Sequence, residues 1–320
     1  MPTRIRTRGV RGGSLVGALI LACALGVPLR QATAQMPAEP SALSIAAAGF
    51  PSMKFALLDS LFGRSGKLKA RFISRARAVF GIEPLERLFG DSSIHDLAAI
   101  TVGDSLTSRQ ITFLSLLPFS AKRGGHVGGY LVGYWPSEHR AARSDAYENP
   151  EGFIEVTPEN ADMQVSDHFR LRDFLTHDQE DVWPKYLVLN ERLIDKLELV
   201  IEDLQAHGVH VDHMVVMSGF RTPEYNRQGV HSGRARESRH QYGDAADVYI
   251  DNNGDGRMSD LNHDGRVDSR DARVIRDAVD RVEAAHPELV GGVGVYHGTR
   301  SHGPFVHIDA RGTRARWGRV

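Results

Sequence analysis

The sequence contains almost no cysteine. Its single cysteine, Cys23, lies inside an apolar run near the N-terminus, so a chain that has lost this run contains no thiol and no disulfide. With 320 residues, of which 41% are hydrophobic, the protein is nevertheless long enough to bury a sizeable core. One large domain or two ordinary ones are expected.

The apolar run, Leu15 to Leu29, follows four arginines and precedes Ala32-Thr33-Ala34, a small-residue cleavage site. This order predicts a secretory signal peptide over residues 1–34. One alternative is an uncleaved anchor helix, but the run is short and weak against the ~20 apolar residues of a membrane span. Another is a lipid anchor on Cys23, for which Leu21-Ala22 is a poor lipobox. We expect a secreted protein of the periplasm or cell envelope, without a stable membrane span after cleavage.

The sequence also lacks an excess of basic over acidic residues. Five of the 39 basic residues lie in the signal peptide, which leaves 34 against 40 acidic residues and a net charge of −6. No basic surface for nucleic acid is therefore expected. Much of the acidic excess is local, because residues 251–271 contain six aspartates and three arginines. Such local acidity suggests bound cations.

Residues 35–49 are rich in Ala, Pro and Ser and are predicted to form a flexible linker. Residues 50–160 then have the patterns of a helical and β-rich N-terminal region. Tyr134 and Trp135 either pack into its core, the interpretation we favour, or stack on sugar rings. The helical patterns are Phe55–Phe62 and Leu68–Phe80, and the strand patterns are Ile111–Leu117, Tyr130–Trp135 and Phe153–Thr157.

The strongest helical pattern follows Asn190, a residue type that caps helices, and it ends at Gly208. An alternating segment, Val209–Met217, predicts a strand directly after it. This strand leads into a turn that presents Arg221.

Three side chains have the types and spacing of metal ligands. His240 precedes Asp247 by seven residues, at the start of a predicted strand, and His307 lies on a second predicted strand. Two neutral imidazoles and one carboxylate would leave a fourth tetrahedral position open, which is the arrangement of a catalytic zinc site. Taken alone, each histidine is more typical of an ordinary core or surface residue.

These residues belong to four segments that resemble the zinc D-alanyl-D-alanine carboxypeptidases and murein endopeptidases, whose fold is shared by the hedgehog signalling domain. The resemblance implies an α+β zinc peptidase domain with an antiparallel sheet over residues 161–320. It also implies that His240, Asp247 and His307 bind Zn²⁺, and that Arg221 holds a substrate carboxylate or the polarised carbonyl. The four segments are Ser166–Phe174, Ser218–Asn226, Ser238–Asp247 and Gly292–Trp317.

The sequence departs from the family pattern at the position of the general base. Related peptidases often place a glutamate or histidine two or three residues before the last histidine ligand, where this sequence has Phe305 and Pro304. His302 is the first substitute for proton transfer, with His297 as an alternative and a solvent-exposed loop histidine as the plain interpretation. A further candidate base, Asp309, is also suited to orienting a ligand imidazole. The residues predicted to support the ligands are Ser238 and Asp309.

Two acidic loops follow the predicted strand that contains Asp247. The second acidic loop, residues 260–271, matches a calcium loop at every ligand position, with Gly265 at the sharp turn and aspartate in place of glutamate at the last position, as in dockerin-type loops. A helix is expected after it. The first acidic loop, residues 251–259, is incomplete, and both could also be solvated turns. The predicted ligands are Asp260, Asn262, Asp264, the carbonyl of Arg266, Asp268 and Asp271, with Asp251, Asn253 and Asp255 as a possible second site.

Together, these patterns predict a secreted zinc metallopeptidase, stabilised by Ca²⁺, that hydrolyses peptide bonds of bacterial peptidoglycan as a carboxypeptidase or endopeptidase. One alternative is a non-catalytic binding module for cell wall or protein, stabilised by zinc and calcium, which the residues at positions 304 and 305 favour. Another is a general extracellular protease. No oligomeric state follows from the sequence.

Overall fold

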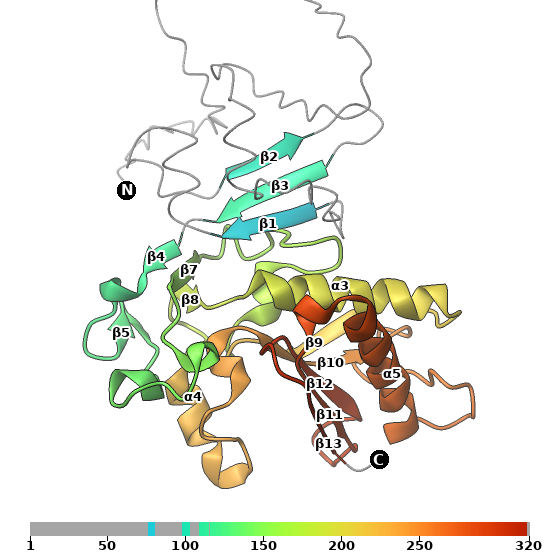
Figure 1. Ribbon diagram of the computed structural model, residues 1–320. Coiled ribbons are helices and arrows are strands. Elements are labelled where there is room, and N and C mark those ends of the chain that lie inside the picture. Colours follow the sequence, from blue (N-terminus) through green and yellow to red (C-terminus); the bar gives the residue numbers. More distant parts are fainter. Residues whose placement is uncertain (1–75, 81–97, 103–108, 115, 319–320) are drawn as a thin grey trace, which may run out of the picture. The chain divides into compact units, whose positions relative to one another are not determined.

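The computed structural model describes residues 76–80, 98–102, 109–114 and 116–318 (Figure 1). The predicted signal peptide and linker lie outside these residues. No helix in the described part of the chain is long and apolar enough to cross a membrane.

The first described strands form a three-stranded sheet in the order β1-β3-β2. β1 (Ala76–Phe80) pairs in parallel with β3 (Arg109–Leu114), and β2 (Ala98–Val102) pairs with β3 in antiparallel fashion. The helix predicted up to Phe80 is therefore wrong for its last five residues. Their sequence, Ala-Arg-Ala-Val-Phe, has no clear alternation, and it is the pairing with β3 that makes it a strand.

Asp247 and His307 were predicted on strands, and both lie in a sheet of five strands in the order β13-β11-β12-β10-β9. All pairs are antiparallel except β11 with β13. This mixed architecture agrees with the predicted α+β class and a largely antiparallel sheet. The strands are β9 (Met214–Ser218), β10 (Ala245–Ile250), β11 (Gly292–Tyr296), β12 (Phe305–Asp309) and β13 (Ala315–Gly318).

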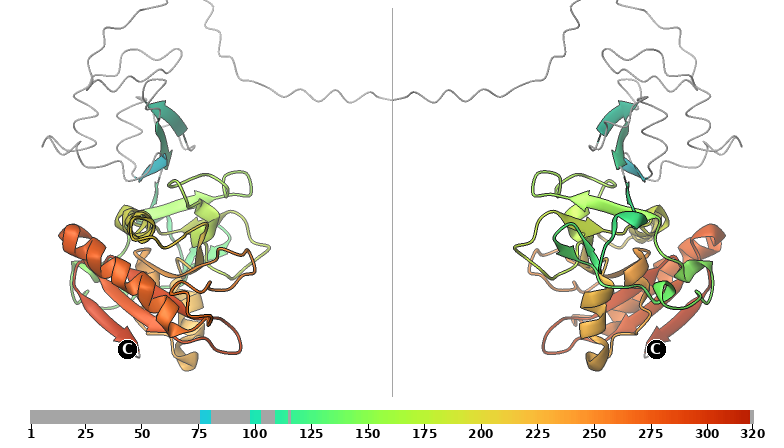
Figure 2. Two further views of the ribbon diagram at one scale, coloured as in Figure 1. Left: turned by 90° about the vertical axis from the view of Figure 1, so that its right-hand side faces the viewer. Right: turned by 90° about the vertical axis from the view of Figure 1, so that its left-hand side faces the viewer.

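Two long helices accompany this sheet. In α3 (Glu191–Ala206), the Asn190 side chain accepts a hydrogen bond from the backbone N–H of Arg192, which confirms the predicted helix start. α5 (Ser269–Ala285) follows the second acidic loop, as predicted, and packs against α3, β11 and β12. Figure 2 shows α5 running along the side of the sheet.

The strand predicted over Val209–Met217 is shorter than expected, because β9 begins only at Met214. Its partner β10 ends at Ile250, which pairs with Met214, and the first acidic loop begins directly afterwards. Residues 209–213 therefore have no strand to pair with.

The core extends further toward the N-terminus than the predicted boundary at residue 160. One cluster of buried apolar side chains runs from Val127 to Ile308 and includes Trp135 and Phe153. The Trp135 indole N–H donates to the carbonyl of Gln241 (2.8 Å), so this segment reaches the residue after a predicted zinc ligand. Core packing is thus confirmed for Trp135, whereas Tyr134 is 50% exposed.

Smaller elements complete this body. A three-stranded antiparallel sheet consists of β4 (Leu116–Pro118), β7 (Gly152–Val156) and β8 (Lys185–Leu187), and a short hairpin of β5 (His126–Val127) and β6 (Tyr130–Leu131). The short helix α4 is Pro223–Gln228. The 3₁₀-helices are Phe119–Ala121, Pro136–Glu138, Asp145–Tyr147, Leu171–Phe174, Val230–Ser232, Arg239–Tyr242 and Pro287–Leu289.

Candidate zinc site

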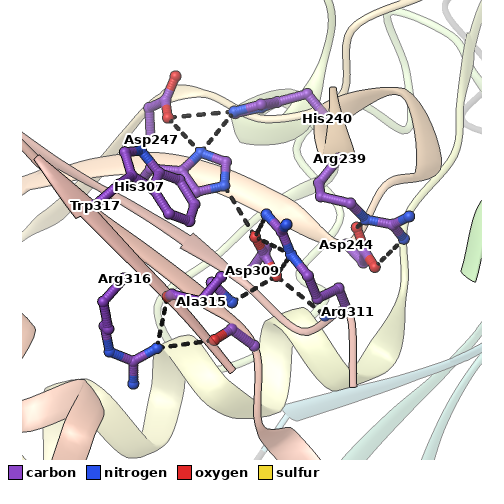
Figure 3. A network of polar contacts seen from close by, with 12 residues as sticks. Arg239, His240, Asp244, Asp247, His307, Asp309, Arg311, Ala315, Arg316 and Trp317 are labelled. Carbon is purple, nitrogen blue, oxygen red and sulfur yellow. Dashed lines mark hydrogen bonds and ion pairs between the residues drawn. The ribbon is translucent and has the colours of Figure 1, made fainter. Parts of the chain in front are cut away.

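Strand register brings two of the predicted ligands together. Asp247 on β10 lies directly opposite His307 on the antiparallel strand β12, so both side chains leave the sheet on the same face. His240 comes from the 3₁₀-helix that precedes β10. Its ring reaches the pair from the side, as Figure 3 shows.

The three ligand atoms converge on one point. His240 Nε2 lies 3.2 Å from Asp247 Oδ1 and 3.1 Å from His307 Nδ1, and His307 Nδ1 lies 3.0 Å from Asp247 Oδ1. Ligands about 2.0–2.1 Å from a tetrahedral Zn²⁺ lie about 3.3 Å from one another, so these separations fit the ion closely. All three residues are buried.

The remaining imidazole nitrogens determine which atoms carry protons. His240 Nδ1 lies 2.7 Å from the carbonyl oxygen of Gly219, and His307 Nε2 lies 3.2 Å from Asp309 Oδ2, so both nitrogens must donate. In the neutral imidazoles, His240 Nε2 and His307 Nδ1 then carry lone pairs. Two nitrogen lone pairs and a carboxylate oxygen therefore face each other without a hydrogen between them, and a cation satisfies all three.

Electrostatics support the same conclusion. Burial lowers the pKa of His240 below its ordinary value, although Asp247 opposes the shift. Burial raises the pKa of Asp247, but the two histidines lower it further, to well below its ordinary value. Burial lowers the pKa of His307, but Asp247 and Asp309 more than offset this and raise it. The cluster thus holds an ionised carboxylate and favours one added positive charge.

This geometry agrees with the comparison with known protein families. Residues 167–268 match the family Peptidase M15. The match covers about a third of the chain, contains His240 and Asp247, and ends before His307. It supports a zinc metallopeptidase of this family, in line with the His-Asp-His cluster. No match was found among curated proteins or among solved structures, and the hedgehog-like fold stays a prediction.

Asp309 lies behind His307 and is completely buried. Besides the contact with His307 Nε2, its carboxylate accepts hydrogen bonds from the Gly292 N–H (2.8 Å) and from the guanidinium and backbone N–H of Arg311. Burial raises the pKa of Asp309, but His307 and Arg311 lower it far more, so the carboxylate stays ionised. Asp309 therefore fixes the ring that presents Nδ1 to the metal position.

Trp317 is a site residue that the sequence patterns did not single out. Its ring lies 5.1 Å from the ring of His307, and its indole N–H donates to the hydroxyl of Tyr296 (2.8 Å). It crosses β11 at Gly294, where an added Cβ would lie 2.3 Å from the indole nitrogen. Because Gly294 pairs with His307 on one side and Trp317 on the other, this glycine is the signal that could have located the contact.

Arg221 contacts a predicted ligand directly. Its Nε donates to Ser218 Oγ (2.8 Å), and a terminal nitrogen donates to Asp247 Oδ2, the oxygen that does not face the histidines. The guanidinium therefore orients the ligand carboxylate. It also lines the cleft above the cluster, which has a volume of about 740 Å³.

The candidate bases and Ser238 lie on the walls of this cleft. His302, His297 and Ser238 all line it. His302 Nδ1 lies 2.8 Å from the carbonyl oxygen of Gly303 and must donate to it, so Nε2 carries the lone pair. The Ser238 carbonyl accepts from the Gln241 N–H and closes the turn that holds His240.

The two acidic loops differ in how their carboxylates are used. In the first, Asp251 accepts hydrogen bonds from four consecutive backbone N–H groups, those of residues 253–256, which occupy its lone pairs. In the second, Asp260 accepts from the N–H groups of Asp264 and Gly265, and Gly265 has a φ of +81°. Within the described part of the chain, neither loop gathers three carboxylates as closely as the zinc ligands gather.

The end of the second acidic loop forms the N-terminus of α5. Asp268 caps the helix, and its own N–H donates to the buried carboxylate of Asp271 (2.7 Å). Arg270 forms ion pairs with Asp264 (2.6 Å) and Asp268 (2.8 Å), two of the predicted calcium ligands. The guanidinium therefore competes with a cation for these oxygens.

Proposed function

We propose that this protein is a secreted zinc metallopeptidase that hydrolyses peptide bonds of bacterial peptidoglycan. The observation that carries the proposal is the convergence of His240 Nε2, His307 Nδ1 and Asp247 Oδ1, which lie 3.0–3.2 Å from one another. The match of residues 167–268 to Peptidase M15 adds the reaction class. The peptidoglycan substrate comes from the resemblance of the four sequence segments.

His240, Asp247 and His307 would hold the zinc ion. When bound, Zn²⁺ lowers the pKa of water and polarises a carbonyl, which is the chemistry that peptide hydrolysis requires. Arg221 has two parts in this scheme. One side of its guanidinium holds Asp247, and its remaining N–H groups are available to stabilise negative charge that develops on the substrate carbonyl oxygen.

His302 is the residue we assign to proton transfer. Its Nδ1–H is committed to the Gly303 carbonyl, which leaves Nε2 as a proton acceptor on a cleft wall. The ring packs edge-on against Phe305 (5.1 Å between centroids), which restricts its orientation. Phe305 itself, at a position where related peptidases often carry an acid or base, thus positions the substitute.

The test is to incubate the full chain with peptidoglycan, with and without Zn²⁺, and to identify the released peptides by mass spectrometry. Zinc-dependent release is expected, and the masses distinguish endopeptidase from carboxypeptidase action. Arg221→Ala should lower kcat by about 10²–10³ when it is assayed at saturating Zn²⁺, because the loss of its hydrogen bond to Asp247 also weakens zinc binding. Wild-type turnover by this variant would remove the role of Arg221, and no cleavage by zinc-loaded protein would favour the binding-module alternative.

Calcium binding in the second acidic loop is a further part of the proposal. It rests on the ligand pattern of residues 260–271 and on the positive φ of Gly265, both typical of calcium loops. The first acidic loop is left out, because its ligand pattern is incomplete and four backbone N–H groups already donate to Asp251. β10 contains Asp247 and leads into the acidic loops at its C-terminal end. A Ca²⁺ bound in the second acidic loop would therefore stabilise this strand.

A further inference from the structure

The cleft above the zinc ligands is rich in arginine. Five arginines line it, against two carboxylates, Glu237 and Asp247. Three of the five are neutralised by a carboxylate of their own: Arg221 by Asp247, Arg239 by Asp244, and Arg311 by Asp309. The other two, Arg143 and Arg234, require a separate explanation.

Arg234 has no carboxylate partner among the described residues. One terminal nitrogen donates to the carbonyl of Tyr225 (2.8 Å), and the guanidinium carbon lies 4.3 Å from the centroid of the Tyr225 ring. These contacts hold the side chain in place but leave its charge uncompensated. Arg234 lines the cleft, and its guanidinium has further N–H donors besides the one bound to the Tyr225 carbonyl.

Arg143 shares its only described carboxylate partner. Glu237 pairs with Arg143 (3.4 Å) and, at shorter distance, with Arg140, so two guanidinium groups compete for one negative charge. Arg143 also stacks on the Tyr147 ring, with its guanidinium carbon 3.6 Å from the centroid. This stacking favours one orientation of the guanidinium, and the cleft gains a second cation that is incompletely neutralised.

We propose that Arg143 and Arg234 are specificity residues that bind side-chain carboxylates of the peptide substrate. This inference rests on the proposed function and defines the substrate class further, as peptides with free carboxylates outside the bond that is cut. The geometry of a guanidinium matches a carboxylate through two parallel hydrogen bonds. A bound zinc ion adds positive charge to the same cleft and strengthens the preference for an anionic peptide.

The test uses two peptidoglycan peptides that differ only in their side-chain carboxylates, which are free in one and converted to carboxamides in the other. For the zinc-loaded full chain, KM should be about fivefold lower for the free carboxylate, a value at the upper end for exposed charge pairs. Arg143→Gln and Arg234→Gln should each reduce this ratio, with kcat nearly unchanged. High salt should reduce it as well, because exposed charges are screened.

The matched control is Arg227→Gln, an exposed arginine that pairs with Glu224 outside this cleft and should leave the ratio unchanged. Dissociation constants of both peptides for the metal-free chain, measured by calorimetry, separate the two proposals. If neither peptide is cleaved but the free carboxylate still binds more tightly and the two cleft variants lose this preference, the proposed function fails and the inference stands. Equal binding of both peptides, or a full preference in both variants, overturns the inference.

Discussion

Replacing Asp309 by asparagine should weaken zinc binding, because the Asp309 carboxylate orients the ring of His307. The carboxylate is completely buried, accepts from His307 Nε2 at 3.2 Å, and forms an ion pair with Arg311. An asparagine of nearly the same shape keeps the packing but removes the charge that holds the proton on Nε2. The His307 ring can then adopt the tautomer or rotation that withdraws the Nδ1 lone pair from the metal position.

Two magnitudes follow from these contacts. Loss of a carboxylate that orients a metal-binding histidine typically lowers metal affinity about 10- to 100-fold, or about 1.4–2.8 kcal/mol. Separately, Arg311 loses its partner, but its side chain is 21% exposed, so water compensates in part. We therefore expect the metal-free variant to lose about 1–3 kcal/mol of unfolding free energy.

The assay measures zinc affinity by competition with a chromophoric chelator, and the free energy of unfolding by urea titration of the metal-free protein. Asp244→Asn is the matched control, because Asp244 is also buried and pairs with Arg239 but forms no hydrogen bond to a ligand histidine in the described structure. It should lose stability and keep its zinc affinity within about threefold. If Asp309→Asn behaves in the same way, the carboxylate is structural only and the reasoning about His307 is refuted.

Three further predictions concern other parts of the molecule. Gly294→Ala should displace Trp317 from His307, cost about 1–3 kcal/mol and change tryptophan emission, whereas Gly303→Ala, whose added Cβ has its nearest neighbour at 3.9 Å, should do neither. A hydrogen bond to Glu198 raises the pKa of His168 above 6.5. The wild type should therefore be more stable than His168→Gln below pH 6.5, and this difference should disappear as the pH rises through the raised pKa. A difference in urea unfolding that grows with pH would contradict this. Removal of Ca²⁺ with Zn²⁺ retained should lower Tm if the second acidic loop binds calcium, and an unchanged Tm would exclude that site.

The His-Asp-His cluster could be predicted in part, because each of its residues lies in a short segment with a recognisable local pattern. Asp247 and His307 each lie in a short stretch rich in apolar residues, whereas their convergence depends on the pairing of β10 with β12. The period of two also places His307, Asp309 and Arg311 on one face in sequence order. α3 was predictable for the same reason, since the Asn190 cap and one apolar face specify it locally.

Features that depend on tertiary pairing could not be predicted in this way. Ala76–Phe80 continues a helical period, and only its pairing with β3 makes it a strand. The contact of Trp317 with His307 requires β13 to run parallel to β11, an arrangement that no local pattern indicates. Likewise, Arg140, the second partner of Glu237, is 97 residues away from it in sequence. Its ion pair with Glu237 leaves Arg143 incompletely neutralised.

The hydrogen bond from Trp135 to the Gln241 carbonyl has a practical consequence. The segment that matches Peptidase M15 covers residues 167–268, yet the core also includes side chains from residues 127–165 and 272–308. A polypeptide trimmed to the matched segment would expose the surfaces that Trp135 and Phe153 cover, and would leave the turn beside His240 without its indole partner. Truncated versions for biochemistry should therefore begin no later than residue 116 and include β12, since a fragment limited to the matched segment would lack both His307 and the N-terminal part of the core.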